Sequence, residues 1–169
     1  MGVTINYEGK LKSEQSYEQL VDVSVAFAIK NGMPFEQFAL NQKRLERVAN
    51  EEDWNYDGPV KGIKILPSED CEPLWLEFDE NLIIQDFCKT QFAGKEIHIA
   101  IIELFDALSQ YFSELIIIDE GEYWETRDAG RLQELIDECF ELMDSAKNKD
   151  KKLSGPFRLE DGRIVDLMR

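Results

Sequence analysis

The chain has 169 residues, 43% of them hydrophobic, and carries 35 Asp and Glu against 19 Lys and Arg, a formal net charge of −16. A charge of this sign repels nucleic-acid phosphates and anionic membrane surfaces and attracts basic partners. We therefore expect no nucleic acid and no membrane as partner, and a basic protein fits the charge best. The alternative is that the acids serve only solubility. No apolar run reaches the roughly 20 residues of a membrane span, and the N-terminus lacks the apolar stretch of a signal peptide, which predicts a cytoplasmic protein.

Length and composition predict one domain over residues 1–148, followed by a linker and a β-hairpin extension over residues 149–169. Cys71, Cys88 and Cys139 are odd in number and widely spaced. This favours reduced, buried thiols over a disulfide framework or a zinc site. We expect no cofactor and no metal, and a monomer or weak homodimer.

Alternation and capping signals delimit the first two elements. Residues 3–7 alternate as on one face of a strand, and Gly9 is expected to end that strand. A helix is expected to begin at Ser16, with Gln19 in capping-box spacing, and to end at Gly32. Its apolar stripe consists of Leu20, Val21, Ser24, Phe27 and Ala28.

The middle of the chain changes from polar to β-like. Residues 35–40 predict a strand, but the sequence then becomes polar and charged up to residue 61, which predicts a long loop or excursion. Between residues 62 and 88 the pattern predicts three successive antiparallel strands, with a turn at residues 79–81 between the last two.

The second half predicts two helices on either side of a strand. Residues 94–112 carry a strong helical stripe. Residues 115–119 are too short and too β-branched for a helix and predict a buried strand. Thr126 or Asp128 is expected to cap a third helix. The apolar face of that helix consists of Leu132, Leu135, Ile136, Cys139 and Met143.

The tail places Asp161 and Gly162 between two alternating segments, the signal of a hairpin with a two-residue type I′ turn. Taken together, the elements predict an α+β fold. We expect a two-layer sandwich in which about three helices pack on one face of a mostly antiparallel sheet.

Two stretches carry a resemblance to known sequences. With KTQFAGKEIHI at residues 89–99 and DEGEYWET at residues 119–126, the chain resembles a family of uncharacterised bacterial cytoplasmic proteins. The resemblance covers roughly residues 3–128. It implies a single bacterial cytosolic domain, and it implies no activity, cofactor, partner or site residue.

One candidate site lies where a strand meets the start of the 94–112 helix. Lys89 and Lys95 flank this point, and Thr90 and Gln91 add neutral hydrogen-bonding groups. A helix N-terminus favours anions, so these four residues are a candidate site for a carboxylate or phosphate. The alternative is that Thr90 and Gln91 cap the helix while the lysines pair with surface acids.

A second candidate is catalytic. Cys88 and His98, the single histidine, have a spacing that permits a thiol nucleophile with its base, and Asp119 or Glu120 could orient the imidazole ring. No local signature supports this arrangement. The alternative is a partly buried structural histidine.

The third candidate is an acidic and aromatic loop. Four carboxylates in seven residues could hold a hard cation, but the loop lacks the spacing of a calcium-binding motif. An anchor patch for a basic protein surface fits the composition better. The alternative is that Trp124 is a half-buried plug at the sheet edge. The loop residues are Asp119, Glu120, Glu122, Tyr123, Trp124 and Glu125.

Trp75 and Glu77 alternate with apolar neighbours and are expected on the opposite face of the sheet from the core. If no helix covers that face, it is a candidate protein-binding surface together with Gln85. The leading hypothesis is therefore a non-enzymatic binding or inhibitory module, similar to an immunity protein or antitoxin, that engages a basic partner. The alternatives are a small thiol- or carboxylate-dependent hydrolase and a domain that binds a small anionic ligand.

Overall fold

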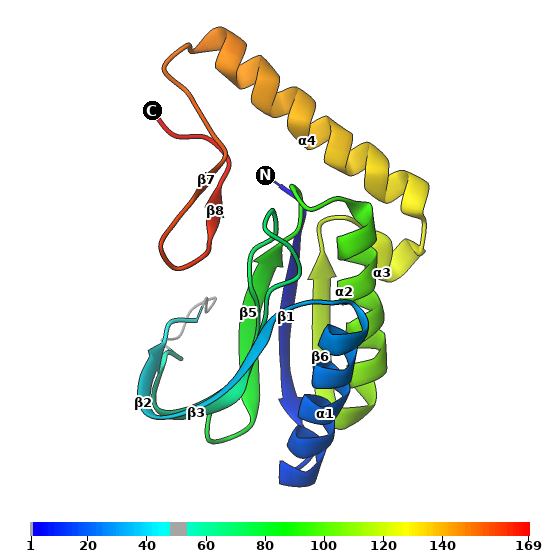
Figure 1. Cartoon of the computed structure of the whole chain (residues 1–169), viewed down its shortest axis with the longest axis vertical. Coiled ribbons are helices and arrows are strands. Elements are labelled where there is room, and N and C mark those ends of the chain that lie inside the picture. The colour runs from blue at the N-terminus through cyan, green and yellow to red at the C-terminus, as the bar shows by residue number, and fades with distance from the viewer. Residues whose placement is uncertain (1, 48–53) are drawn as a thin grey trace.

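The computed structural model describes residues 2–47 and 54–169, and these form the expected α+β fold, with small antiparallel sheets and helices (Figure 1). The helices are α1 (Glu14–Lys30), α2 (Lys95–Leu108), α3 (Tyr123–Thr126) and α4 (Ala129–Lys149), and a 3₁₀ turn, η1, spans Ser109–Tyr111. The strands are β1 (Thr4–Leu11), β2 (Phe35–Leu45), β3 (Tyr56–Ile65), β4 (Leu74–Phe78), β5 (Ile83–Lys89), β6 (Phe112–Asp119), β7 (Phe157–Arg158) and β8 (Ile164–Val165).

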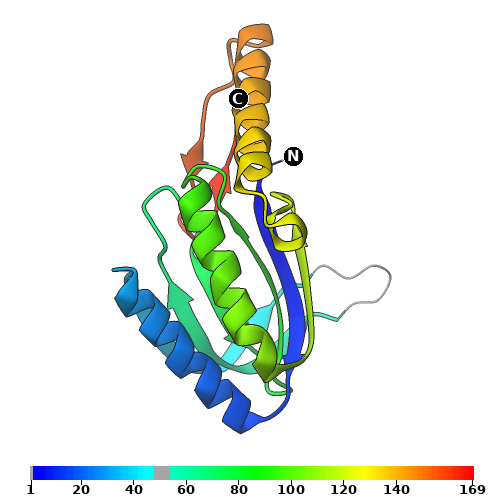
Figure 2. The same cartoon turned by 90° about the vertical axis from the view of Figure 1, so that its right-hand side faces the viewer.

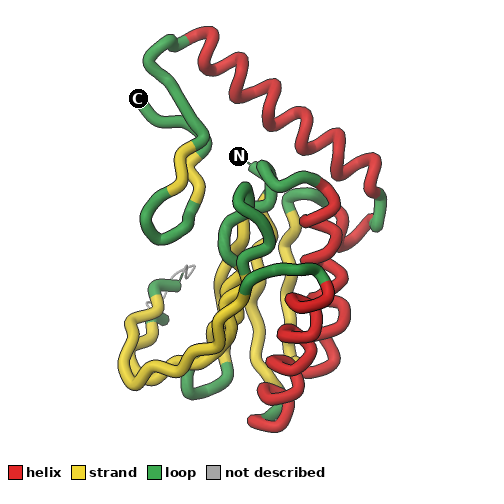
Figure 3. The backbone as a smooth tube through the Cα atoms, in the orientation of Figure 1, coloured by secondary structure: helices red, strands yellow, loops and turns green. Residues whose placement is uncertain are grey.

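The strands form two three-stranded antiparallel sheets, in the orders β5-β1-β6 and β2-β3-β4, and a small β7–β8 hairpin. A tight turn joins β4 to β5, in which the Asp79 amide donates to the Ile83 carbonyl at 3.0 Å. In addition to this turn, a hydrogen bond connects the two sheets: the hydroxyl of Tyr7 on β1 donates to the carbonyl of Trp75 on β4 at 2.7 Å. The two sheets therefore lie next to each other, although β4 and β5 form no ladder, and the tube view shows this arrangement (Figure 3).

Helices α1 and α2 cover one face of the strands (Figure 2). The core lies between these layers. Tyr7 of β1 contacts Phe105 of α2 at 4.9 Å between ring centroids, and Phe78 of β4 meets Tyr17 of α1 edge to face. Leu20 of α1 is fully buried in this core. The apolar stripes of the two helices thus bury the odd-numbered face of β1.

Two expectations for the N-terminal part were wrong. β1 continues through Gly9, because the β6 backbone crosses so close that a Cβ at this position would lie 2.4 Å from the Glu114 carbonyl oxygen. Helix α1 starts earlier than expected. Ser13 is its N-cap and accepts a hydrogen bond from the Ser16 amide at 3.1 Å. The expected end is confirmed, since Gly32 follows the helix with φ of 63°.

The expected loop after residue 40 was also wrong in part. β2 extends to Leu45 and pairs with β3, which already begins at Tyr56. Side chains of β2 are exposed on both faces, so the strand carries no apolar alternation that a sequence pattern could detect. Residues 48–53 of the expected excursion lie outside the described residues.

The three strands expected after residue 62 are confirmed as the later part of β3, β4 and β5. Helix α2 ends at Leu108, so Phe112 belongs to β6 rather than to the helix. The strand expected at residues 115–119 is present but is buried on one face only: Ile117 lies in the core, whereas Ile116 and Ile118 are exposed on the other face. Asp128, one of the two expected caps, is the N-cap of α4.

The expected C-terminal hairpin is present, with a different turn. Leu159 donates to the Arg163 carbonyl, which leaves a three-residue loop that ends in Gly162 at φ of 88°. The buried Glu72 carboxylate fastens this hairpin to the sheet. It accepts hydrogen bonds from the amides of Lys89 at 2.8 Å and Ile164 at 2.9 Å. No helix in the described ranges is both long and apolar enough to cross a membrane.

Gly62 of β3 offers a test of how β3 and β4 pack. A Cβ built on Gly62 lies 1.9 Å from the Leu76 carbonyl oxygen, so Gly62→Ala forces the strands apart. We expect a loss of about 1–3 kcal/mol in the free energy of unfolding, measured by chemical denaturation. Gly130→Ala in the first turn of α4 is the control: its Cβ would meet only the Asp128 side chain, at 3.2 Å, and we expect a change of less than about 1 kcal/mol. Equal effects of the two variants would contradict the packing argument.

Candidate functional site

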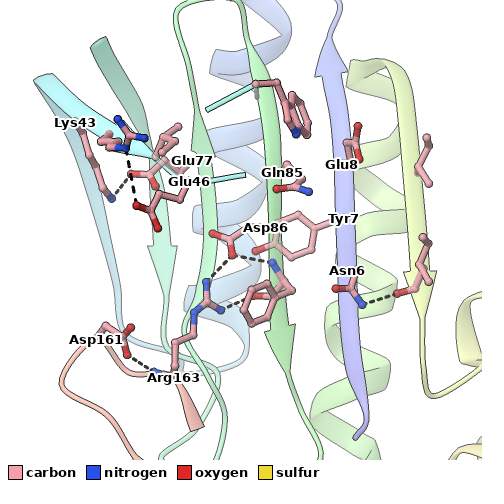
Figure 4. A pocket seen from close by; sticks show the side chains of 16 residues that line it. Asn6, Tyr7, Glu8, Lys43, Glu46, Glu77, Gln85, Asp86, Asp161 and Arg163 are labelled. Carbon is pink, nitrogen blue, oxygen red and sulfur yellow. Dashed lines mark hydrogen bonds and ion pairs between the residues drawn. The ribbon is translucent and has the colours of Figure 1, made fainter. Parts of the chain in front are cut away.

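The face of the sheet opposite the helices forms the floor of an open cleft of about 1360 Å³ (Figure 4). Side chains alternate along each strand, so those that do not enter the core point to this face. Cross-strand pairing arranges them in two rows, Gln85–Glu8–Ile116 and Phe87–Asn6–Ile118. The floor therefore combines a central carboxylate with apolar and amide neighbours.

The cleft is walled on one side by the end of β2 and by the residues before β3, and the C-terminal hairpin closes one end (Figure 4). The β2 wall carries Lys43, and the hairpin contributes Asp161 and Arg163. The remaining wall residues are Arg44, Leu45, Glu46, Trp54 and Glu77.

The cations of the cleft are already paired with its own acids. Lys43 Nζ lies 2.7 Å from Glu77, Arg44 Nε lies 3.8 Å from Glu46, and Arg163 lies 2.5 Å from Asp86. Among the described residues this leaves the Glu8 and Asp161 carboxylates without a cation. Net negative charge at the floor and mouth is therefore available to an incoming cation.

Arg163 shows how this surface holds a guanidinium group. Its Cζ lies 4.0 Å from the centre of the Phe87 ring, and Nη1 donates to the Phe87 carbonyl at 2.6 Å. The carboxylates of Asp86 and Glu72 lie at 2.5 and 3.2 Å. Burial opposes the charged form, but Asp86 and Glu72 outweigh it and raise the pKa of Arg163. An aromatic face and two carboxylates thus hold an arginine on this face.

Sequence reasoning placed part of this surface correctly. Glu77 and Gln85 line the cleft on the face away from the core, as expected. Trp75 points to the same side but packs under β2, where it meets Phe38 edge to face and lies 4.8 Å from the ammonium groups of Lys43 and Lys64. Trp75 is therefore half covered by its own chain.

The acidic and aromatic loop at residues 119–126 lies elsewhere, at the end of β6. Asp119 is buried and accepts hydrogen bonds from the amides of Gly121 at 2.7 Å and Trp124 at 2.9 Å. Tyr123 and Trp124 are half-buried against the core. Arg127 lies over both rings. Each ring therefore has one part in contact with the core and one part exposed to solvent. This is compatible both with an anchor patch for a basic protein and with Trp124 as a half-buried plug at the sheet edge.

The acids of this loop do not act as one cluster. Glu122 pairs with Arg131 at 3.1 Å, Glu125 is exposed, and Asp119 is buried. Burial raises the pKa of Glu120, which a hydrogen bond with Asn6 opposes. Within residues 2–47 and 54–169, no group of three or more His, Cys, Asp or Glu side chains has an arrangement that could hold a metal ion.

His98 and Asp119 are brought together, with Thr90 as a third member. His98 Nε2 lies 3.0 Å from Asp119 Oδ1, and His98 Nδ1 lies 2.7 Å from Thr90 Oγ1. Burial alone raises the pKa of the Asp119 carboxyl, but the hydrogen bond and charge of His98 outweigh it, so its pKa lies below the ordinary value. The distances are those of a catalytic triad, yet all three side chains are buried, so the closed network offers no access to a substrate.

Cys88 does not join this network. Its thiol lies 3.8 Å from the Cys71 thiol and donates to the Glu72 carbonyl at 3.3 Å. The contact with Cys71 and burial both raise the pKa of the Cys88 thiol well above its ordinary value. The thiolate that a cysteine nucleophile needs is therefore disfavoured.

The candidate anion site is occupied by contacts within the chain. Lys89 pairs with Asp166 at 2.7 Å, and Thr90 is engaged by His98. Gln91 is buried and accepts from the Val3 amide at 3.1 Å. Gly94 rather than Thr90 or Gln91 is the N-cap of α2. Lys95 is half-buried at the helix start.

Sequence reasoning missed most of the cleft. Asn6 and Glu8 alternate with Ile5 and Tyr7, so their common face was detectable from the sequence. The contribution of Arg163 was not, because it depends on the docking of a hairpin 77 residues from Asp86 in the chain.

We expect the hydrogen bonds of Asp119 to contribute to the stability of the fold. Asp119→Asn replaces an acceptor of three hydrogen bonds, and we expect a loss of about 1–3 kcal/mol in the free energy of unfolding at pH 7. Because the pKa of Asp119 is lowered from 3.8, its contribution is present above about pH 4 and is lost as the pH falls through the lower, folded-state value. The difference between wild type and variant should therefore shrink in denaturation curves at about pH 3. Glu125→Gln is the exposed control, expected within about 0.5 kcal/mol of wild type.

The thiols make a second prediction. Cys139 is half-buried, whereas Cys71 and Cys88 are buried, so iodoacetamide should modify Cys139 first in the native protein. Mass spectrometry of tryptic peptides measures the order. Modification of Cys88 ahead of Cys139 would indicate an accessible thiolate and would favour the hydrolase hypothesis.

Comparisons of the chain with protein-family models, with curated proteins and with solved structures each find no match. The resemblance to bacterial cytoplasmic proteins therefore stays a prediction.

Proposed function

We propose that this protein is a non-enzymatic binding module whose open cleft engages a basic protein partner. The observation that carries the proposal is the uncovered face of the β5-β1-β6 sheet. It exposes Ile116 by 56% and Ile118 by 62% beside the carboxylate of Glu8. Large apolar side chains on an open sheet face are typical of an interaction surface.

The charge of the whole chain adds to this local argument. A net charge of −16 steers basic proteins toward the molecule over a screening length of about 8 Å at physiological salt. Arg163 shows the kind of contact that a partner's arginine could make on this face, because its guanidinium group is held by an aromatic ring and a carboxylate. An inhibitory role, as in an immunity protein or antitoxin, is the form of this function that size and charge favour.

The hydrolase and the small-anion hypotheses remain the alternatives. No specific observation supports either hypothesis, because Cys88, Thr90 and Gln91 are buried and hydrogen-bonded within the chain.

The test is a titration of the ¹⁵N-labelled protein with a hexa-arginine peptide, followed by NMR. We expect shift changes at Glu8, Ile116 and Ile118, and weaker binding at about 500 mM than at about 50 mM NaCl. Glu8→Lys should weaken binding about tenfold or more, because it places a like charge at the floor of the cleft.

Glu18→Lys is the matched control. Glu18 is exposed on α1, in the layer opposite the cleft, and its replacement changes the net charge by the same amount. If both variants lose the same amount of peptide affinity, the interaction depends on net charge alone, which would contradict a site in the cleft. Shift changes confined to the 119–126 loop would move the site there.

A further inference from the structure

Strand β6 leaves backbone hydrogen-bonding groups unused along one side. It is an outer strand with β1 as its neighbour in the sheet. The Glu120 amide donates to the Thr4 carbonyl, so the even-numbered residues of β6 exchange hydrogen bonds with β1. The amides and carbonyls of Leu115 and Ile117 therefore point outward. Within the described ranges no strand pairs with them.

This edge lacks the features that protect the edges of most sheets. Lysine, proline and bulges discourage pairing with another chain. The one register shift of β6 against β1 falls between Phe112 and Glu114, and the run from Leu115 to Ile118 contains no lysine, proline or bulge. β2, an outer strand of the other sheet, differs. It carries Lys43 and Arg44 and a bulge between Leu40 and Lys43. Of these two strands, β6 is the better suited to accept a further strand.

The side chains on the open face of β6 specify what that strand should carry. Glu114, Ile116, Ile118 and Glu120 follow one another at a spacing of two, and all four are exposed. A strand laid antiparallel along this edge presents its own alternate residues beside them. The complementary pattern on that face is a cation, two apolar residues and a second cation.

We propose that the β6 edge binds an extended segment of the basic partner as an additional antiparallel strand. This inference rests on the proposed function and names the manner of recognition. Main-chain hydrogen bonds to Leu115 and Ile117 provide affinity, and the alternate side chains against Ile116, Ile118 and the two flanking glutamates provide selectivity. A second copy of this chain is a poor occupant, because it brings the same glutamates and a further net charge of −16.

The probe is the peptide acetyl-Arg-Thr-Val-Thr-Val-Thr-Arg-amide, whose odd positions carry the expected pattern. When its first residue lies opposite Glu120, its fourth and sixth residues lie opposite Ile117 and Leu115. N-methylation of those two amides removes hydrogen bonds to β6 and should weaken binding about tenfold, as measured by calorimetry or NMR. N-methylation of the third and fifth amides, which point to solvent, has the same charge and should change the affinity by less than about threefold.

A direct readout comes from hydrogen exchange. The amides of Leu115 and Ile117 should exchange more slowly when the unmodified peptide is bound, because they become donors to it. If both methylated peptides bind as the parent does, the edge inference is overturned. The proposed function then still stands, provided that hexa-arginine binding responds to Glu8→Lys and not to Glu18→Lys.

Two further outcomes also overturn the inference. The parent peptide can fail to bind while hexa-arginine occupies the cleft, which limits recognition to the sheet face. Alternatively, sedimentation of the protein alone can show a dimer that Ile118→Lys dissociates, which would make a second copy the occupant of the edge. If neither peptide binds, the proposed function fails together with the inference.

Discussion

The pairing of β1 on both of its sides is the constraint on which the rest of the structure depends. Its odd-numbered residues bond to β5 and its even-numbered residues bond to β6, as the Val3–Thr90 and Thr4–Glu120 contacts show. The odd-numbered side chains enter the core under α1 and α2, and the even-numbered ones form the cleft floor. One strand therefore positions the hydrophobic core and the candidate binding surface together. A shift of its register by one residue would exchange the two faces.

The sequence predicted those elements in which one face is buried and the other is not. α1, α2, α4 and the strands from β3 to β5 each bury one side, and burial imposes the period that a pattern detects. β2 was underestimated because both of its faces are exposed, so its strand conformation depends on the ladder with β3 and on no local signal. The expected end of β1 at Gly9 was wrong for another reason. A glycine usually breaks a strand, but here a neighbouring backbone comes too close for any side chain.

The candidate site was less predictable, because its parts come together only through tertiary contacts. Alternation alone placed Glu77 and Gln85 on the face away from the core. Nothing local indicated that Arg163 would stack on Phe87, or that Ile116 would lie at an open edge rather than inside a sheet. Asp119 in the 119–126 loop differs from the expectation for a different reason. The dense carboxylates of this loop suggested a surface patch, but Asp119 is turned inward to accept hydrogen bonds from His98 and two backbone amides.

The high negative charge compensates for the open edge of β6. An unprotected apolar edge invites pairing between copies of the same chain, which most proteins prevent with a lysine, a proline or a bulge on the strand itself. Here the register shift of β6 lies before this run, between Phe112 and Glu114, and no lysine or proline stands between Leu115 and Ile118; instead Glu114 and Glu120 flank the run and the whole molecule carries −16. Two copies therefore repel each other at the distance where an oppositely charged segment is attracted. Solubility and recognition, which the composition alone presents as alternatives, are on this view two effects of the same acids.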